Sequence, residues 1–358
     1  MIIARAPARI SFGGGGTDLE SYYAAHGGLV VSAAIARYCY VRATEPPDRR
    51  IRLFSADYGV AQTFEPGMIP APEQPLSLPK AAIGCFAGRG LCERGVDLVL
   101  SSDLPPGTGL GSSSAMAVAL VRALAAYTGT AIDAAGAAAL ACAIEIDRLG
   151  MPIGRQDQYA SAFGGLNSIL FTASGVRVEP IELPPDAIAA LSRRLLLFST
   201  GQRRDSAGIL RQQQRDSAGS PAVIESLHRI KGLALEIRAA LLAGDLDRFG
   251  QLLDQSWQIK RCLSDKISSS AIDRWYATAR RAGALGGKIA GAGGGGFLML
   301  YCPPARQPAL REAMARSGLS EMPFDFELAG ARLLYQEGAA QPVPRAREAG
   351  AGSRPVVW

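Results

Sequence analysis

Residues 103–115 read DLPPGTGLGSSSA, and this stretch determines how the rest of the chain is interpreted. It follows an apolar run, 96–104, that predicts a strand, and it opens an alanine-rich segment, 113–127, that predicts a helix. Free backbone N–H groups and the positive end of the helix dipole meet at such a junction. Glycines at alternate positions let the backbone approach a bulky anion, and the serines that follow supply hydroxyls. The stretch therefore predicts a cradle for a polyphosphate, in preference to an ordinary glycine turn with a serine N-cap.

Two known phosphate-binding motifs do not fit the glycine clusters. No lysine follows the glycines of 103–115, as a P-loop requires. The GxGxxG match at 291–296 precedes a strand-like FLMLY and lacks a βαβ unit, so it is not a Rossmann loop. A third cluster, 13–16, follows the first predicted strand. We expect the three glycine-rich turns to meet around one ligand.

Composition narrows the class of protein. The 358 residues suggest two domains, and a formal charge of +6 without a lysine or arginine block argues against a nucleic-acid-binding arm. No apolar run is long enough to span a bilayer, and the start lacks a signal-peptide pattern. The six dispersed cysteines form no CxxC pair and predict reduced thiols in a cytoplasmic protein. The chain has only two histidines, which argues against a histidine-based zinc site and against a Ser-His-Asp relay.

The order of predicted elements indicates an α+β fold. Strands dominate the first part of the chain, helices dominate the middle, notably 205–245, and a βαβ-like pattern closes it. We divide the chain into an N-terminal domain, 1–190, and a C-terminal domain, 191–338. Residues 339–358 are rich in Ala, Gly, Pro and Arg, and we expect a disordered tail there.

Two carboxylates and one arginine are candidates for chemistry. Glu145 ends an alanine-rich helix, and Asp157 follows a GMPIG turn. A phosphoryl transferase needs one carboxylate to hold Mg²⁺ and usually another to orient or deprotonate the acceptor hydroxyl. Taken singly, either carboxylate could be merely solvated. Arg9, inside an apolar strand, needs a partner, and Asp157 is a natural one.

These stretches together resemble a known family. RAPARISFGGGGTDL, DLPPGTGLGSSSA and KIAGAGGGGF resemble, in order and spacing, the three motifs of the GHMP kinases (galactokinase, homoserine, mevalonate and phosphomevalonate kinases). GMPIGRQDQ resembles the segment that bears the catalytic aspartate in galactokinase-like members. Within the superfamily, GGGTD, GRQDQYASAFGG and STGQRRDSAGIL most resemble the D-glycero-D-manno-heptose 7-phosphate kinases, which phosphorylate an anomeric hydroxyl.

The resemblance implies an N-terminal domain like ribosomal protein S5 domain 2, a ferredoxin-like C-terminal domain, and a site for ATP and Mg²⁺ between them. Ser113 and Glu145 would bind the metal. Asp157 would act as catalytic base or orient the sugar hydroxyl, and Arg9 would pair with it and stabilise the transferring charge. The nucleotide loop would comprise Pro106, Gly107, Gly109, Leu110, Gly111, Ser112, Ser113 and Ser114. The sugar would meet Gly15, Gly16, Thr17, Asp18, Asp157 and Arg204.

The sequence indicates the type of reaction more clearly than it indicates the identity of the substrate. Galactokinases read EHTD where this chain reads GGTD, so hexose recognition must differ. Arg204 could bind the 7-phosphate, although a solvated pair with Arg203 at a helix start is the alternative. A neutral-sugar kinase such as a fucokinase, and a non-catalytic sugar sensor, remain the rival functions. Retention of Arg9, Glu145 and Asp157 argues against the sensor. We expect a monomer or homodimer with no nucleic-acid or membrane partner.

Overall fold

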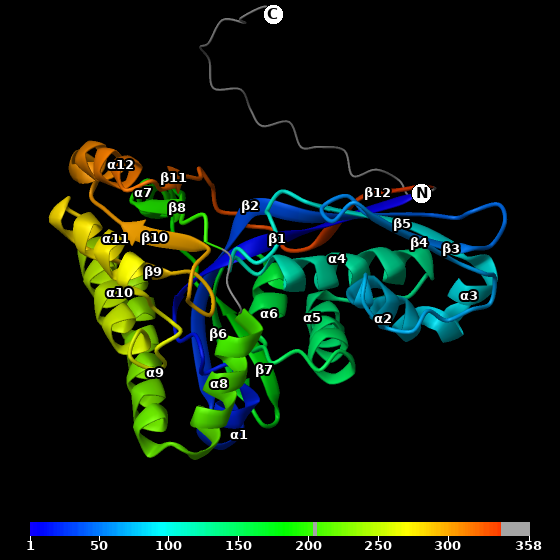
Figure 1. The fold of residues 1–358 in the computed structure, drawn as a ribbon, viewed down its shortest axis with the longest axis horizontal. Helices are drawn as coiled ribbons and strands as arrows, with labels where there is room; N and C mark the ends of the chain where they lie inside the picture. The colour runs from blue at the N-terminus through cyan, green and yellow to red at the C-terminus, as the bar shows by residue number, and fades with distance from the viewer. Residues whose placement is uncertain (203–205, 338–358) are drawn as a thin grey trace, which may run out of the picture.

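The computed structural model describes residues 1–202 and 206–337. Arg204 and the predicted tail at 339–358 therefore lie outside the described residues. The described part combines two sheets with helices, which is the α+β class expected from the sequence (Figure 1).

The larger sheet contains eight strands in the order β12-β1-β2-β5-β3-β4, and β6 joins β2 to β7. Its long central pair, β1 (Ile2–Gly13) and β2 (Gly28–Thr44), is antiparallel. The predicted hairpin around Tyr58 and Gly59 is confirmed as β3 (Ile51–Ser55) and β4 (Val60–Phe64). The remaining strands of the first half are β5 (Val96–Ser102), β6 (Leu166–Thr172) and β7 (Gly175–Pro180).

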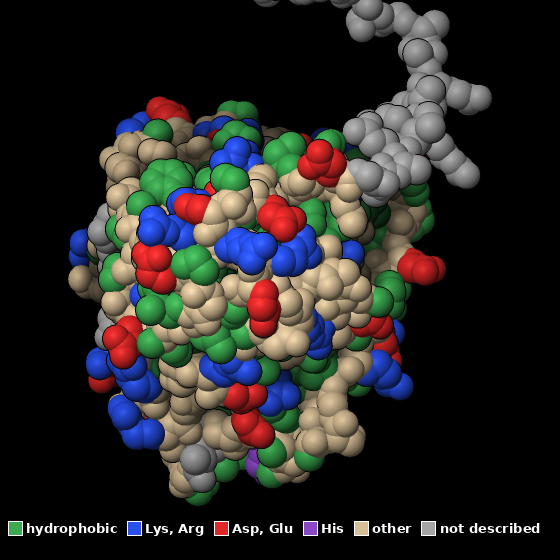
Figure 2. Space-filling model, turned by 90° about the vertical axis from the view of Figure 1, so that its right-hand side faces the viewer, with side chains coloured by type: hydrophobic (Ala, Val, Ile, Leu, Met, Phe, Trp, Pro, Cys, Tyr) green, Lys and Arg blue, Asp and Glu red, His purple; other side chains and the backbone are tan. Residues whose placement is uncertain are grey.

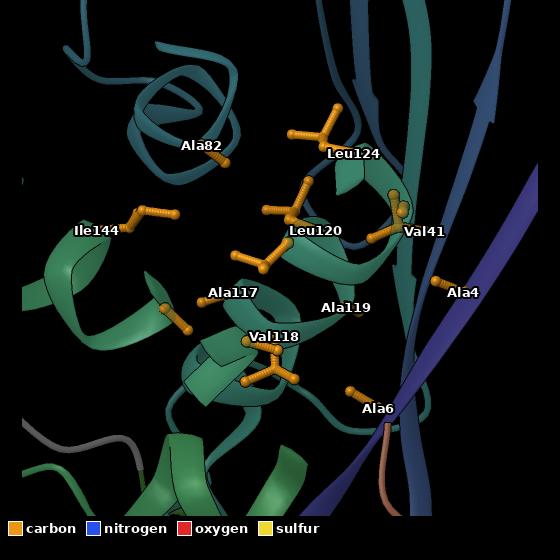
Figure 3. Packing of buried hydrophobic residues seen from close by; sticks show 14 of the residues in the cluster. Ala4, Ala6, Val41, Ala82, Ala117, Val118, Ala119, Leu120, Leu124 and Ile144 are labelled. Carbon is orange, nitrogen blue, oxygen red and sulfur yellow. The ribbon is translucent and has the colours of Figure 1, made fainter. Parts of the chain in front are cut away.

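Helix α4 (Ser112–Tyr127) fills the space between this sheet and the helices beneath it. One side of α4 faces Ala4, Ala6 and Val41 of the sheet, and the other side faces Ala82 and Ile144 (Figure 3). The many alanines of α4 allow this close approach on both sides, and almost the whole helix is buried. The neighbouring helices are α2 (Ser77–Phe86), α5 (Ala134–Cys142) and α6 (Gln156–Phe163). Shorter helices are α1 (Glu20–His26), α3 (Leu91–Arg94) and α7 (Pro185–Ser192).

A four-stranded sheet forms the second unit, in the order β11-β8-β10-β9. Its strands are β8 (Leu195–Ser199), β9 (Gly286–Ile289), β10 (Phe297–Tyr301) and β11 (Ser320–Glu321). The helical stretch predicted over 205–245 is two helices, α8 (Ser206–Gly219) and α9 (Pro221–Leu242). The helices that follow are α10 (Leu246–Lys260), α11 (Ser270–Arg281) and α12 (Gln307–Arg316).

The last strand returns to the first sheet. β12 (Arg332–Gln336) pairs antiparallel with β1, so residues assigned from the sequence to the C-terminal domain lie in the N-terminal sheet. The ammonium of Met1 and the carboxylate of Glu337 form an ion pair at this edge. The division of the chain near residue 190 stays a prediction, because helix α9 also packs against β1 and β2.

In the face shown in Figure 2, basic and acidic side chains are interspersed and form no patch of one sign. Among the helices of the described residues, none is both long and apolar enough to cross a membrane.

Candidate active site

The three glycine-rich turns line one cavity of about 160 Å³, as the sequence predicts. Gly15 and Gly16 come from the turn after β1, Gly107, Gly109 and Gly111 from the turn before α4, and Gly291 from the turn after β9. The second and third turns are in direct contact. A Cβ on Gly296 would lie 2.3 Å from the carbonyl oxygen of Thr108, so only glycine allows this contact.

The turn before α4 has the backbone that a cradle requires. Gly107, Gly109 and Gly111 have φ angles of 79°, 82° and 78°, the left-handed region that favours glycine. Gly111 is the residue before the first turn of α4, and Ser112, Ser113 and Ser114 line the cavity from that turn. The predicted cradle thus has glycines at the mouth and hydroxyls at the helix N-terminus.

Two residues of the predicted nucleotide loop do not line this cavity. Leu110 is fully buried in the hydrophobic core, and its carbonyl accepts a hydrogen bond from the Arg9 amide at 2.9 Å. Its side chain therefore anchors the loop. Pro106 lines a neighbouring cavity of about 530 Å³, which meets the first cavity at Gly107, Ser112 and Ser113.

Arg9 and Asp157 form the expected pair. Arg9 Nε and Nη2 donate to the two oxygens of Asp157 at 2.8 and 2.7 Å, and Nη1 donates to the Gly109 carbonyl at 2.7 Å. The Arg9 side chain is 4% exposed and that of Asp157 is 22% exposed. A Cβ on Gly111 would lie 3.3 Å from Asp157 Oδ2. One guanidinium therefore joins the carboxylate to the cradle, and the carboxylate remains open to the cavity.

Glu145 lies on the other side of the cradle. It is fully buried in a π-helical segment (Ala143–Arg148), where it accepts hydrogen bonds from Ser113 Oγ and Gln158 Nε2, both at 2.7 Å. Burial raises the pKa of Glu145 to about 6, although the hydrogen bonds oppose this rise. Glu145 is therefore not a solvated surface carboxylate, because its side chain is 0% exposed.

Asp18 lines the cavity, but Thr17 does not. Asp18 is 2% exposed and accepts hydrogen bonds from the Gly16 amide and from Gln156 Nε2. Thr17 is fully buried, where its hydroxyl donates to the Gly14 carbonyl and accepts from the Leu29 amide. The expected contact of Thr17 with the sugar is therefore corrected. Its hydroxyl is used to hold the turn that presents Gly15, Gly16 and Asp18.

Sequence reasoning missed the neighbouring cavity and two lysines. The neighbouring cavity is bounded by Tyr58 of the β3–β4 turn and by the segment before α2, which the sequence shows only as a proline-rich loop. Lys260, which lines the first cavity, is 6% exposed, and Lys288, which is not among its lining residues, is 2% exposed. A lysine inside the strand-like run KIAG was the available signal, since a buried ammonium needs a reason.

The oxygen groups of the cradle suit Mg²⁺ better than a softer metal. Ser113 and Glu145 provide a hydroxyl and a carboxylate, which are hard ligands. Within residues 1–202 and 206–337, no cluster of three or more His, Cys, Asp and Glu side chains could hold a metal ion. Mg²⁺ bound beside phosphates usually takes only one or two protein ligands, so the donor set fits that use.

Family models match both halves of the chain. The model for the N-terminal domain of GHMP kinases matches residues 77–165, and the model for the C-terminal domain matches residues 237–319. The chain is 29% identical to the D-glycero-alpha-D-manno-heptose 7-phosphate kinase of Campylobacter jejuni, over 92% of this chain and 98% of the relative. It is 30% identical to the galactokinase of Mycobacterium bovis, over 67% of this chain and 73% of that one.

A solved structure gives the same result for the fold. The crystal structure of a D-glycero-D-manno-heptose 1-phosphate kinase from Bacteriodes thetaiotaomicron superposes with a TM-score of 0.79. The two are 27% identical, and the match covers 94% of this chain and 99% of that one. The predicted GHMP kinase fold is confirmed. The chain belongs to the GHMP kinase family, as one of its sugar kinases.

Proposed function

We propose that this chain transfers the γ-phosphoryl group of ATP to the anomeric hydroxyl of D-glycero-D-manno-heptose 7-phosphate. The observation that carries the proposal is the Arg9–Asp157 pair, which is hydrogen-bonded to the glycine cradle and open to the cavity. The heptose phosphate kinases matched over nearly the whole chain support the choice of acceptor.

ATP would occupy the two adjoining cavities. The triphosphate would lie over the cradle, where the backbone amides around Gly107 to Ser112 and the N-terminus of α4 favour anionic oxygens. The adenosine part would enter the neighbouring cavity, which the cradle borders. Ser113 and Glu145 would hold Mg²⁺, which neutralises charge on the phosphates when it is bound.

Asp157 would act on the acceptor. Its carboxylate would take the proton of the anomeric hydroxyl, the hydroxyl oxygen would bond to the γ-phosphorus, and the bond to the β–γ bridging oxygen would break to release ADP. Arg9 fixes both oxygens of Asp157 and holds the cradle through Gly109. The guanidinium would also offset negative charge that spreads over the transferring group.

The pKa of Glu145 gives a pH-dependent prediction for metal binding. Because burial raises this pKa to about 6, the carboxyl is increasingly protonated below that pH and must release its proton to ligate Mg²⁺. We expect the apparent affinity for Mg²⁺, measured by calorimetry with a non-hydrolysable ATP analogue, to weaken by about tenfold per pH unit below 6. ATP itself titrates in this range, so Glu145→Gln is the control. The variant should bind Mg²⁺ more weakly and retain only the pH dependence of ATP, and an unchanged profile would remove Glu145 from the metal site.

The acceptor is tested by acceptor-dependent release of ADP. D-glycero-D-manno-heptose 7-phosphate should support turnover, whereas mannose, galactose and L-fucose at equal concentration should support little. The position of the new phosphate is read by ³¹P–¹H correlation, which should couple it to the anomeric proton. Turnover of L-fucose without turnover of the heptose phosphate would replace this proposal with the neutral-sugar kinase.

A further inference from the structure

Gln158 is a buried polar residue to which the proposed reaction gives no role. It follows Asp157 in helix α6 and is 0% exposed. Unlike Asp157, it is not among the residues that line either of the two adjoining cavities. Its amide therefore lies behind the wall of the site and does not face a ligand. A buried amide needs hydrogen-bond partners, because its removal from water is otherwise costly.

Only one end of the Gln158 amide has a partner. Nε2 donates to Glu145 Oε2 at 2.7 Å. The other end, Oε1, is buried and has no hydrogen-bond partner among the described residues. The carboxylate fixes the direction of the amide, because only the N–H end can donate to it. Methionine, which is close to glutamine in size, would avoid the cost of the unpartnered carbonyl. The contact with Glu145 therefore explains the amide, whereas packing alone does not.

Glu145 is held from two sides, and the two sides differ in their exposure to ligands. Ser113 Oγ donates to Glu145 Oε1 at 2.7 Å, and Ser114 also donates to the carboxylate. Both serines lie in the first turn of α4 and line the cavity. A nucleotide or a metal ion that enters the cavity would meet these serines and would not meet Gln158. Gln158 is thus the donor whose contact with Glu145 can stay the same when the site is filled.

The local backbone gives a reason for such a support. Glu145 lies in a π-helical segment, Ala143–Arg148, and the Met151 amide donates to its carbonyl at 2.9 Å. Short π-helical segments inside helices occur frequently at functional sites. A glutamate side chain has several rotatable bonds and loses rotamer freedom when it is fixed. One donor on each oxygen, Ser113 and Gln158, fixes the plane of the carboxylate before any ligand arrives.

Helix α6 serves both sides of the site through consecutive residues. Asp157 is paired with Arg9 and lines the cavity, while Gln158 is bonded to Glu145 behind it. Neighbouring residues of an α-helix point about 100° apart, so one turn of α6 can reach both places. The same turn therefore positions the carboxylate proposed for the acceptor and the donor to the carboxylate proposed for the metal.

We propose that Gln158 is the positioning residue that holds Glu145 in the orientation in which it binds Mg²⁺. This inference rests on the proposed function and adds a determinant of metal affinity to the same site. Partners that orient a ligating carboxylate reduce the freedom that must be lost when the ion binds, which strengthens binding. Gln158 itself would touch neither the ion nor the nucleotide.

The affinity for Mg²⁺ is the first test. In Gln158→Met, Mg²⁺ should bind about 10- to 100-fold more weakly to the complex with a non-hydrolysable ATP analogue, as measured by calorimetry. The affinity for the analogue alone, measured in EDTA, should be unchanged, because Gln158 lines neither cavity. Wild-type affinity for Mg²⁺ in a folded Gln158→Met protein would overturn the proposal.

A second buried glutamine provides the matched control. Gln307 is 7% exposed, and its Nε2 donates to the carbonyls of Arg193 and Cys302. It lies at the start of α12 and lines neither cavity. Gln307→Met removes a buried, hydrogen-bonded amide of the same kind and should leave the Mg²⁺ affinity at the wild-type value. An equal loss in this control would mean that Gln158 acts only through general stability.

A double variant tests whether Gln158 acts through Glu145. In Glu145→Gln the carboxylate is already absent, so the addition of Gln158→Met should weaken Mg²⁺ binding little further. Additive losses would show that Gln158 affects the metal by another route and would overturn the positioning role. Thermal unfolding reports whether each variant folds. If Gln158→Met does not fold, Gln158→Asn takes its place, since this shorter amide remains polar but falls short of Glu145.

Kinetics give a readout that a purely structural role would not move. Gln158→Met should have a low rate at limiting Mg²⁺, and excess Mg²⁺ should restore most of kcat because it compensates for weaker binding. The KM for the acceptor should stay at the wild-type value, since Asp157 is untouched. A kcat that stays low at saturating Mg²⁺, with the affinity for Mg²⁺ unchanged, would assign the effect to a displaced Asp157 and contradict the proposal.

Failure of this inference is distinguishable from failure of the proposed function. Binding of Mg²⁺ with the ATP analogue needs no acceptor, so Gln158 is tested whichever sugar the protein uses. If Glu145→Gln weakens Mg²⁺ binding and Gln158→Met does not, the positioning role is wrong and the metal site stands. If neither variant weakens it, both the positioning role and the metal site are wrong. No turnover of any phosphorylated sugar by the wild type would overturn the proposed substrate alone.

Discussion

Asp157→Asn is expected to lower kcat by about 10²- to 10⁴-fold while ATP still binds. The amide keeps the size of the side chain but cannot accept the proton of the acceptor hydroxyl. It also loses one of the two oxygens that receive hydrogen bonds from Arg9. The cradle does not depend on the charge of Asp157, because Arg9 reaches Gly109 through a separate nitrogen. Turnover by coupled ADP release and affinity for an ATP analogue by calorimetry check the two parts.

A matched control lies ten residues before Asp157 in the sequence. Asp147 is an exposed carboxylate in the π-helical segment that carries Glu145. Asp147→Asn removes the same charge from the same region and should leave kcat unchanged. Wild-type turnover in Asp157→Asn would remove Asp157 from the chemistry, whatever its place in the cavity.

Arg9→Met should lower both stability and turnover. The substitution removes a guanidinium that is almost fully buried and leaves the Asp157 carboxylate and the Gly109 carbonyl without their partner. Loss of one partner of a buried ion pair costs about 3 kcal/mol or more of the free energy of unfolding. Chemical denaturation measures this loss, and kcat should fall with it because the carboxylate is no longer fixed.

The double variant separates pairing from packing. In Arg9→Met with Asp157→Asn, the uncompensated carboxylate is absent, so part of the lost stability should return. If the loss of stability in the double variant equals the sum of the losses in the two single variants, the pair contributes nothing through its mutual contact. The orienting role of Arg9 would then be withdrawn.

The parts of the site that the sequence predicted are those where residue type alone is restrictive. Three alternate glycines before an alanine-rich helix have few uses besides close approach to an anion, and the structure gives them left-handed backbones. An arginine inside an apolar strand demanded a partner, which is Asp157. In each case the residue type has an energetic cost in its local setting, and the predicted contact offsets that cost.

The missed features depend on contacts between distant segments. Strand β12 pairs with β1, although the paired residues lie more than 300 positions apart in the sequence. Nothing in the five residues of β12 indicates which strand they pair with. Thr17 has the residue type of a sugar contact, yet its hydroxyl is used by Gly14 and Leu29. Lys260 and Lys288 come from a helix and a strand that meet only after folding. Local sequence patterns do not predict contacts between segments that are far apart in the chain.

A crystal structure of the protein with Mg²⁺, a non-hydrolysable ATP analogue and the heptose 7-phosphate tests the central claim most directly. We predict the γ-phosphate over Gly107 to Ser113, the metal on Ser113 and Glu145, and the anomeric hydroxyl within hydrogen-bond distance of Asp157. A nucleotide bound away from the cradle, or an acceptor whose anomeric hydroxyl lies out of reach of Asp157, would contradict the account.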